Sequence, residues 1–166
     1  MNRAQRLMHM VTPMLLFFGL FVCDRVTKLW ALNFLGDASV MVTSWFNFSL
    51  ILNRGIAWGL LFFDSHVGFY VITALVMCVT ILFGAYLLKC IHNRESWFFE
   101  VCVFTGAFSN IVDRFIYKGV IDFIELHYAS WYWPTFNVAD MCVVVGVVGI
   151  LIKQVRASND SMDKGV

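Results

Sequence analysis

The stretch "VGFYVITALVMCVTILFGAYLL", residues 67–88, carries no charged side chain, and it constrains the fold more than any other feature of this chain. A helix needs about 20 mostly apolar residues to cross the hydrocarbon core of a bilayer, so this stretch is long enough to span one. The 166-residue chain is 60 % hydrophobic and 14 % charged, whereas soluble domains contain about 25 % charged residues. The sequence therefore predicts a single integral membrane domain over residues 1–166.

Three other segments are long and apolar enough to be membrane spans, at about residues 11–34, 97–117 and 136–152. Charged and amide side chains interrupt the second of these, and the third is short. The aromatic residues 131–133 and Pro134 place the start of the short segment at the membrane interface. We therefore predict an all-α membrane protein with four transmembrane helices.

Lysine and arginine residues indicate the orientation of these spans. Seven of them lie before the first span, between the second and third, or after the fourth: Arg3, Arg6, Lys89, Arg94, Lys153, Arg156 and Lys164. Apart from residues near the span ends, the other two loops hold only Arg54 and Lys118. By the positive-inside rule both termini are cytoplasmic, and the loops at about 35–66 and 118–135 face outward.

The first outward loop contains "SVMVTSWFNFSLILN", whose β-branched and aromatic residues predict a small extracytoplasmic sheet. An exposed edge of such a sheet can hold an extended peptide. Residues 153–166 form a polar C-terminal tail, and its part "RASNDSMDKGV", residues 156–166, is expected to be disordered. The net charge of +1 argues against nucleic acid as a partner, and the five cysteines lack the C-x-x-C spacing of a zinc ribbon.

Ionisable side chains lie within the predicted spans, although each costs about 2.5–3.5 kcal/mol at mid-membrane. They are Asp24, Arg25, Lys28, Asp113 and Arg114, with Asp140 near the start of the last span. In the predicted orientation all of them fall in the outer half of the bilayer. Asn110 and Asp113 share one helical stripe. Asn137 and Asp140 share another, which predicts a polar pocket between helices that opens to the outside.

Asp122 lies between Ile121 and Phe123 in the second outward loop. Apolar neighbours desolvate an acid and raise its pKa. If Asp122 comes near Asp140, the two carboxyl groups cannot both ionise easily, and one shared proton is the arrangement of aspartic proteases. One acid then activates a water molecule, and the other protonates the carbonyl oxygen or the leaving amine.

Five motifs in order make the chain resemble the lipoprotein signal peptidase family, also called signal peptidase II. They are "DRVTK" at 24–28, "NRGIAWG" at 53–59, "GAFSNIVDR" at 106–114, "VIDF" at 120–123 and "FNVAD" at 136–140. The resemblance covers nearly the whole chain. It implies a multi-pass aspartic endopeptidase of the bacterial inner membrane, with its active site near the outer leaflet. Such enzymes cut the signal peptide from a diacylglyceryl-modified prolipoprotein, just before the lipidated cysteine.

By this resemblance the catalytic pair is Asp122 and Asp140. The residues that line the substrate pocket or support the pair are Asn53, Asn110, Asp113, Arg114 and Asn137, and Asp24 and Lys28 form a structural polar pair. The resemblance also implies inhibition by the cyclic peptide globomycin and contact with membrane lipid. We expect no cofactor, no metal and a monomeric protein.

Asp113 competes with Asp122 as the partner of Asp140. The adjacent Arg114 favours the charged form of Asp113, whereas Asp122 has no adjacent cation, which favours Asp122 as the catalytic residue.

Two positions depart from the family pattern. Ser109 replaces a common glycine and is expected to be a helix-interface hydroxyl, while Arg25 replaces a typical glutamine and is expected to point into the bundle or snorkel.

Two other functions use the same acids. A proton- or ion-coupled transporter relays protons through intramembrane acids, but here the acids share one depth and no inverted repeat is visible. A metal hydrolase would use Asp122, Glu125, His127 and Asp140, but only one of these residues is a histidine and the chain has no H-E-x-x-H helix.

Overall fold

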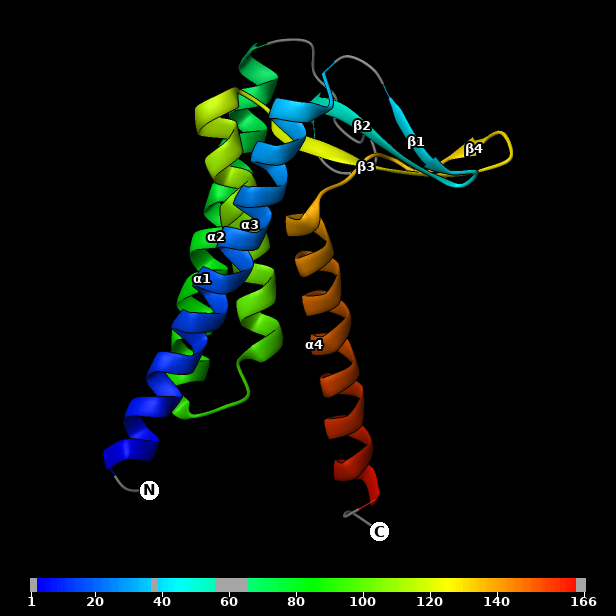
Figure 1. Cartoon of the computed structure of the whole chain (residues 1–166). Helices are drawn as coiled ribbons and strands as arrows, with labels where there is room; N and C mark the ends of the chain where they lie inside the picture. Colours follow the sequence, from blue (N-terminus) through cyan, green and yellow to red (C-terminus); the bar gives the residue numbers. More distant parts are fainter. Residues whose placement is uncertain (1–2, 37–38, 56–65, 164–166) are drawn as a thin grey trace.

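The computed structural model describes residues 3–36, 39–55 and 66–163. Their helices are α1 (Arg3–Phe34), α2 (His66–Asn93), α3 (Phe98–Tyr117) and α4 (Val138–Asp163), and their strands are β1 (Val40–Thr43), β2 (Phe46–Asn53), β3 (Val120–Tyr128) and β4 (Trp131–Tyr132). The helices α1, α2 and α3 lie side by side, and the sheet projects sideways above the start of α4 (Figure 1). Helix α1 begins and α4 ends at the end of the molecule away from the sheet.

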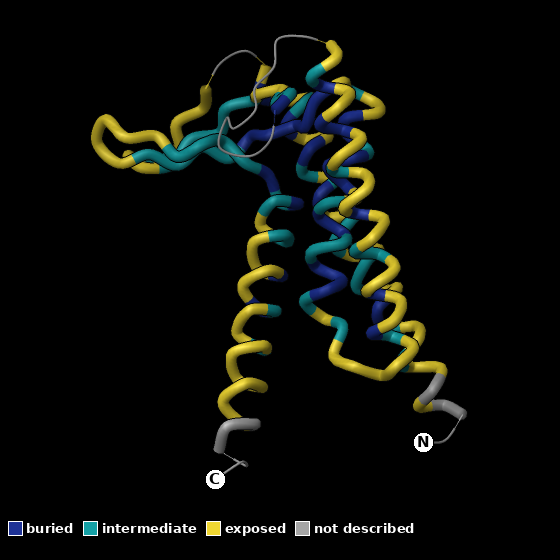
Figure 2. The backbone as a smooth tube through the Cα atoms, turned by 180° about the vertical axis from the view of Figure 1, so that it is seen from behind, coloured by how far each residue is buried: buried dark blue, intermediate teal, exposed yellow. Residues whose placement is uncertain are grey.

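Within the described residues, three helices are long and apolar enough to cross a membrane: Leu7–Phe34, His66–Asn93 and Val138–Asp160. Four helices were predicted as spans, and this length and composition confirm three of them. Helix α3 has only 20 residues, and any 18-residue stretch of it contains the three charged residues Glu100, Asp113 and Arg114. The outward faces of the helices are exposed, and buried positions gather where the helices meet and at the root of the sheet (Figure 2).

The expectation of a disordered tail is wrong for residues 156–163, which continue α4. The segment "KQVRASNDSMD" contains no proline or glycine to end the helix, and lysine, glutamine, arginine and alanine are good helix formers. Residues 164–166, with Lys164, lie outside the described part of the chain, as do residues 56–65 of the first outward loop.

The predicted sheet is confirmed, and it joins the two loops that were predicted to face outward. It is antiparallel in the order β1-β2-β3-β4. Asn53 on β2 pairs with Val120 at the start of β3, and Ile51 pairs with Asp122. Phe136 exchanges backbone hydrogen bonds with Ile124 on β3. The chain that leads into α4 is therefore fixed against the strand that carries Asp122.

Small residues bring α3 and α4 together. A Cβ atom on Gly106 of α3 would collide with the Ala139 carbonyl oxygen of α4, so only glycine allows this approach. Further along α4, Gly149 packs against the Phe99 ring of α3. The close contact between Gly106 and Ala139 places Asp140, in the first turn of α4, beside the polar face of α3.

Candidate active site

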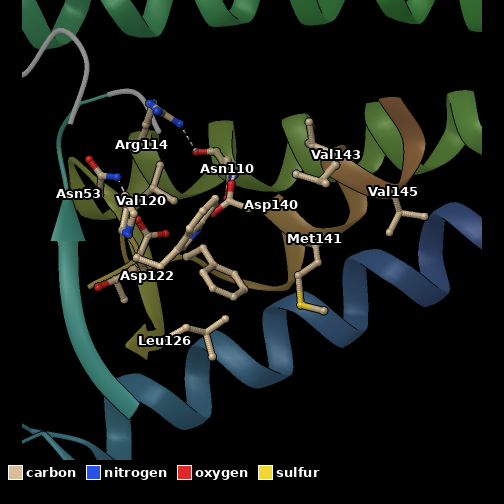
Figure 3. Close-up of a pocket in the computed structure, with 15 residues that line it drawn as sticks. Asn53, Asn110, Arg114, Val120, Asp122, Leu126, Asp140, Met141, Val143 and Val145 are labelled. Carbon is tan, nitrogen blue, oxygen red and sulfur yellow. Dashed lines mark hydrogen bonds between the residues drawn. The ribbon is translucent and has the colours of Figure 1, made fainter. Parts of the chain in front are cut away.

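A cavity of about 490 Å³ lies where α3, β3 and the start of α4 meet (Figure 3). Its charged and amide lining residues are Asn53, Asn110, Arg114, Asp122 and Asp140. The remaining lining residues are mostly apolar, and they include Met141, Val144 and Val145 along the outer face of α4. Both members of the predicted catalytic pair therefore face one cavity, whereas Asp113 is not among the residues that line it.

Asp122 is held by two amide side chains. Its Oδ1 accepts a hydrogen bond of 2.6 Å from Asn137 Nδ2, and its Oδ2 accepts one of 2.9 Å from Asn53 Nδ2. The side chain is buried, with an exposed fraction of 2 %. Burial is the main cause that raises the pKa of Asp122 to about 7, and the negative charge of Asp140 is the second.

Asp140 and Asn137 form a reciprocal cap at the start of α4. The backbone N–H of Asp140 donates to Asn137 Oδ1 at 2.9 Å, and the backbone N–H of Asn137 donates to Asp140 Oδ2 at 3.2 Å. This pattern resembles the capping box, which satisfies free N–H groups of a helix N-terminus. The other oxygen, Asp140 Oδ1, accepts a bond of 2.7 Å from Asn110 Nδ2. Asn137 therefore touches both carboxyl groups of the predicted pair.

All four carboxylate oxygens of Asp122 and Asp140 accept one N–H each, from amide side chains or from the backbone. Within the part of the chain that the structure describes, neither acid forms an ion pair. Two close acids without a bound cation repel each other when both are ionised, and a shared proton removes that repulsion. The geometry is suited to general acid–base chemistry on a water molecule.

Arg114 lies at the edge of the cavity and holds neighbouring backbone. Its Nη1 donates to the Asn110 carbonyl oxygen at 3.2 Å, and its Nη2 donates to the Gly55 carbonyl oxygen at 3.0 Å. The second bond fixes the chain just after β2. Arg114 makes no ion pair with Asp113, although its adjacent position in the sequence suggested one. The cations that pair with Asp113 are Arg25 and Lys28.

A second polar cluster lies between α1 and α3, and we call Asp24, Arg25, Lys28 and Asp113 the buried quartet. The predicted pair Asp24–Lys28 is present, with Oδ2 and Nζ 2.9 Å apart. Arg25 contacts Asp24 at 2.9 Å and Asp113 at 2.6 Å, and Lys28 contacts Asp113 at 2.7 Å. Two acids and two cations give the buried quartet a net charge of zero.

Sequence reasoning expected one polar pocket, but the structure separates the residues into the cavity and the buried quartet. Asn110 connects the two, because its Oδ1 accepts a bond of 2.8 Å from Lys28 while its Nδ2 donates to Asp140. Ser109 donates from Oγ to Asp24 Oδ2 at 2.6 Å, so it is an interface hydroxyl as expected. Arg25 points into the bundle as the centre of two ion pairs, a role that the sequence did not assign.

The candidate ligands of a metal hydrolase do not come together. Glu125 accepts a hydrogen bond from Asn47, and the ring of His127 stacks on Tyr132 on the projecting part of the sheet. In residues 3–36, 39–55 and 66–163, no group of three or more His, Cys, Asp and Glu side chains has the geometry of a metal site.

Known proteins with similar sequences or folds point to one family. A family model described as signal peptidase (SPase) II matches residues 16–156. A lipoprotein signal peptidase of Thermodesulfovibrio yellowstonii is 35 % identical over 140 residues, which cover 84 % of this chain and 91 % of the relative. One of Clostridium novyi is 36 % identical over 149 residues, which cover 86 % of this chain and 96 % of the relative. A bacterial membrane enzyme structure determined by the in meso method is similar with a TM-score of 0.72 and 25 % identity, over 90 % of each chain.

Proposed function

The chain belongs to the signal peptidase II family of lipoprotein signal peptidases, and from this membership we propose that it is an aspartic endopeptidase in which Asp122 and Asp140 share one proton. Membership supports a membrane-embedded protease that removes signal peptides from prolipoproteins. The single observation that carries the proposed mechanism is that both carboxyl groups line one cavity and are both bound by Asn137.

Charge balance in the cavity favours one proton on the pair. Arg114, Asp122 and Asp140 line the same space, and Arg114 is 6 % exposed while Asp122 is 2 % exposed. With both acids ionised these three residues carry a net charge of −1, and with one proton they are neutral. An uncompensated charge is costly in a water-poor cavity, so the singly protonated state is favoured.

The surroundings of the two acids assign the proton to Asp122. Asp140 lies at the N-terminus of α4, where the helix dipole favours a negative charge, and it accepts a bond from Asn110, which is itself bound by Lys28. Asp122 lies on strand β3, between the apolar residues Ile121 and Phe123, and is not part of a helix. We therefore assign Asp140 as the general base and Asp122 as the general acid.

The proposed reaction balances its protons in two steps. Asp140 takes a proton from water as the water oxygen bonds to the scissile carbonyl carbon, and Asp122 gives its proton to the carbonyl oxygen. The resulting diol then collapses, because Asp140 protonates the leaving nitrogen and the C–N bond breaks. The proton of one diol hydroxyl returns to Asp122, which restores the starting state.

We propose that the substrate is a diacylglyceryl-modified prolipoprotein, cut just before its lipidated cysteine. Part of the cavity wall lies on the exposed face of α4, where Met141 is 49 % and Val144 is 61 % exposed. Acyl chains that remain in the bilayer can lie against this apolar face while the peptide bond reaches the two acids. The residues of this arrangement all come from one chain, and we propose that a monomer carries the complete site and binds globomycin there.

The same proposal fixes the orientation in the bacterial inner membrane. The cavity and the sheet are at one end of the molecule, and α1 begins and α4 ends at the other (Figure 1). Basic residues Lys89, Arg94, Lys153 and Arg156 belong to the end away from the sheet. The positive-inside rule then makes both termini cytoplasmic and puts the cavity near the outer leaflet. We propose that α3, enclosed by α1, α2 and α4, is the fourth span.

A gel-shift assay of a lipidated prolipoprotein tests this function. Asp122→Asn and Asp140→Asn are each expected to lower the cleavage rate by about 10³-fold or more, because each removes a proton-transfer group. Globomycin is expected to block cleavage by the unchanged protein. Robust cleavage by both folded variants would rule out the pair. Proton-coupled transport, the alternative considered for these acids, is not favoured by the family to which the chain belongs.

A further inference from the structure

Each acid of the buried quartet holds the backbone just before one of the two proposed catalytic residues. Asp113 Oδ2 accepts the backbone N–H of Ile121 at 3.3 Å, and Ile121 precedes Asp122. Asp24 Oδ1 accepts the backbone N–H of Ala139 at 2.8 Å, and Ala139 precedes Asp140. The positions of the two quartet carboxylates therefore determine where β3 and α4 present the catalytic pair.

Arg25 joins these two carboxylates directly. Its Nη1 donates to Asp113 Oδ1 at 2.6 Å, and its Nη2 donates to Asp24 Oδ2 at 2.9 Å. The guanidinium group is planar, so its two terminal nitrogens lie at a fixed separation. Lys28 also bridges the two acids, but it does so through a single ammonium nitrogen.

We infer that Arg25 is a positioning residue for the reaction, because its bridge between Asp24 and Asp113 sets the separation of the Asp122 and Asp140 carboxyl groups. This inference rests on the proposed function. Arg25 is not a catalytic residue, since it is absent from the described lining of the cavity and its ion pairs are with Asp24 and Asp113.

Arg25 also balances charge next to the pair. Arg25 contacts Asp24 on α1 and Asp113 on α3. The other charged groups of the buried quartet and the cavity are Lys28 on α1, Arg114 on α3, Asp122 on β3 and Asp140 on α4. Removal of the guanidinium changes the buried quartet from neutral to a net charge of −1. A negative charge nearby makes an acid hold its proton more strongly. The catalytic pair then keeps its shared proton to a higher pH.

Arg25→Met and Arg25→Lys test the inference, and Glu100→Gln is the matched control. The Glu100–Lys153 pair, 3.1 Å long, also joins two helices through a fully buried acid, but it does not line the cavity. Cleavage of the lipidated prolipoprotein is followed from pH 5 to pH 9 and normalised to folded protein, which is measured by gel filtration and circular dichroism.

We expect Arg25→Met to lower kcat by about 10- to 100-fold with KM within about threefold, because a misplacement near 1 Å has such an effect. Its loss of activity at alkaline pH should move to higher pH than in the unchanged protein. Arg25→Lys should restore the loss of activity at alkaline pH to the pH seen in the unchanged protein, because lysine returns the positive charge. It should restore only part of kcat, because lysine lacks the planar guanidinium group with its two terminal nitrogens. Glu100→Gln should lower the thermal unfolding temperature and leave kcat and the pH profile unchanged.

Unchanged kcat and an unchanged alkaline limb in folded Arg25→Met would show that Arg25 only stabilises the bundle, and would overturn the inference. If Arg25→Met does not fold, Arg25→Lys decides: full kcat overturns the inference, and reduced kcat at unchanged KM supports it. Failure of the proposed function would give a different result: Asp122→Asn and Asp140→Asn would then retain cleavage, irrespective of the results for the Arg25 variants.

Discussion

Two pairs of aspartates lie at neighbouring sites in this protein, connected by Asn110, and their surroundings differ. Asp24 and Asp113 are bridged by Arg25 and Lys28, and their carboxylates also accept backbone N–H groups. Asp122 and Asp140 are bound by amide groups of asparagine side chains and by one backbone N–H. The first pair has a cation for every acid, and the second has none in hydrogen-bonding contact within the described residues.

The difference gives a physical reason for one pair to be structural and for the other to have the proposed catalytic role. Ion pairs fix both the charge and the position of a carboxylate, so Asp24 and Asp113 can act as rigid anchors. An amide N–H fixes the position of an oxygen while it does less to fix its charge. Asp122 is therefore oriented by Asn53 and Asn137, while its burial raises its pKa to about 7.

Exchange of Asp113 for asparagine gives the largest expected effect on stability. Asp113→Asn leaves Arg25 and Lys28 with one acid between them in a buried site. Breaking a buried ion pair from one side costs about 3–5 kcal/mol. We expect a large drop in the thermal unfolding temperature in detergent. Asp122→Asn is the comparison, because it breaks no ion pair and should lower the unfolding temperature far less. An equal drop in both variants would contradict the distinction between the two pairs.

Loss of the Asn137 side chain should reduce activity more than loss of Asn53. Asn137 contacts both proposed catalytic carboxyl groups and caps α4, whereas Asn53 contacts only one of these two groups, that of Asp122. We expect kcat of Asn137→Ala to fall by about 100-fold and that of Asn53→Ala by about tenfold, as the pair loses orientation. Cleavage rates per folded protein measure both. A larger loss in Asn53→Ala would show that the shared amide does not organise the pair.

Sequence patterns predicted one pair of aspartates better than the other. The apolar neighbours of Asp122 and the position of Asp140 at the start of a span drew attention to both, and the structure places both at one cavity. The ion-pair bridge that Arg25 makes between Asp24 and Asp113 could not be predicted from the sequence in this way. Its partner Asp113 is 88 residues away, and the contact depends on how α1 and α3 are rotated about their axes. A helical period gives the face of one helix, not its alignment with another.

The pH dependence of activity should reveal the proton that distinguishes the second pair. The pKa of Asp122 is raised to about 7, so the acid holds its proton below that pH and loses it above. We expect kcat to fall by about tenfold per pH unit at pH values well above 7, since the general acid is then ionised. A kcat that stays constant up to pH 9 would show that the pair does not share a proton.

Stability should carry a smaller signature of the same proton. The folded-state pKa of Asp122, about 7, lies above the ordinary value of 3.8, so the folded protein binds this proton more strongly than the unfolded chain. Its contribution to stability is therefore full below pH 3.8 and is lost as the pH rises through about 7. The unfolding temperature of the unchanged protein should fall more between pH 5 and pH 8 than that of Asp122→Asn, which cannot titrate at this position. If the unfolding temperature of both proteins changed equally with pH, the proton would reside on another group. The Glu100→Gln variant is the control: it keeps Asp122, so its unfolding temperature should change with pH as that of the unchanged protein does.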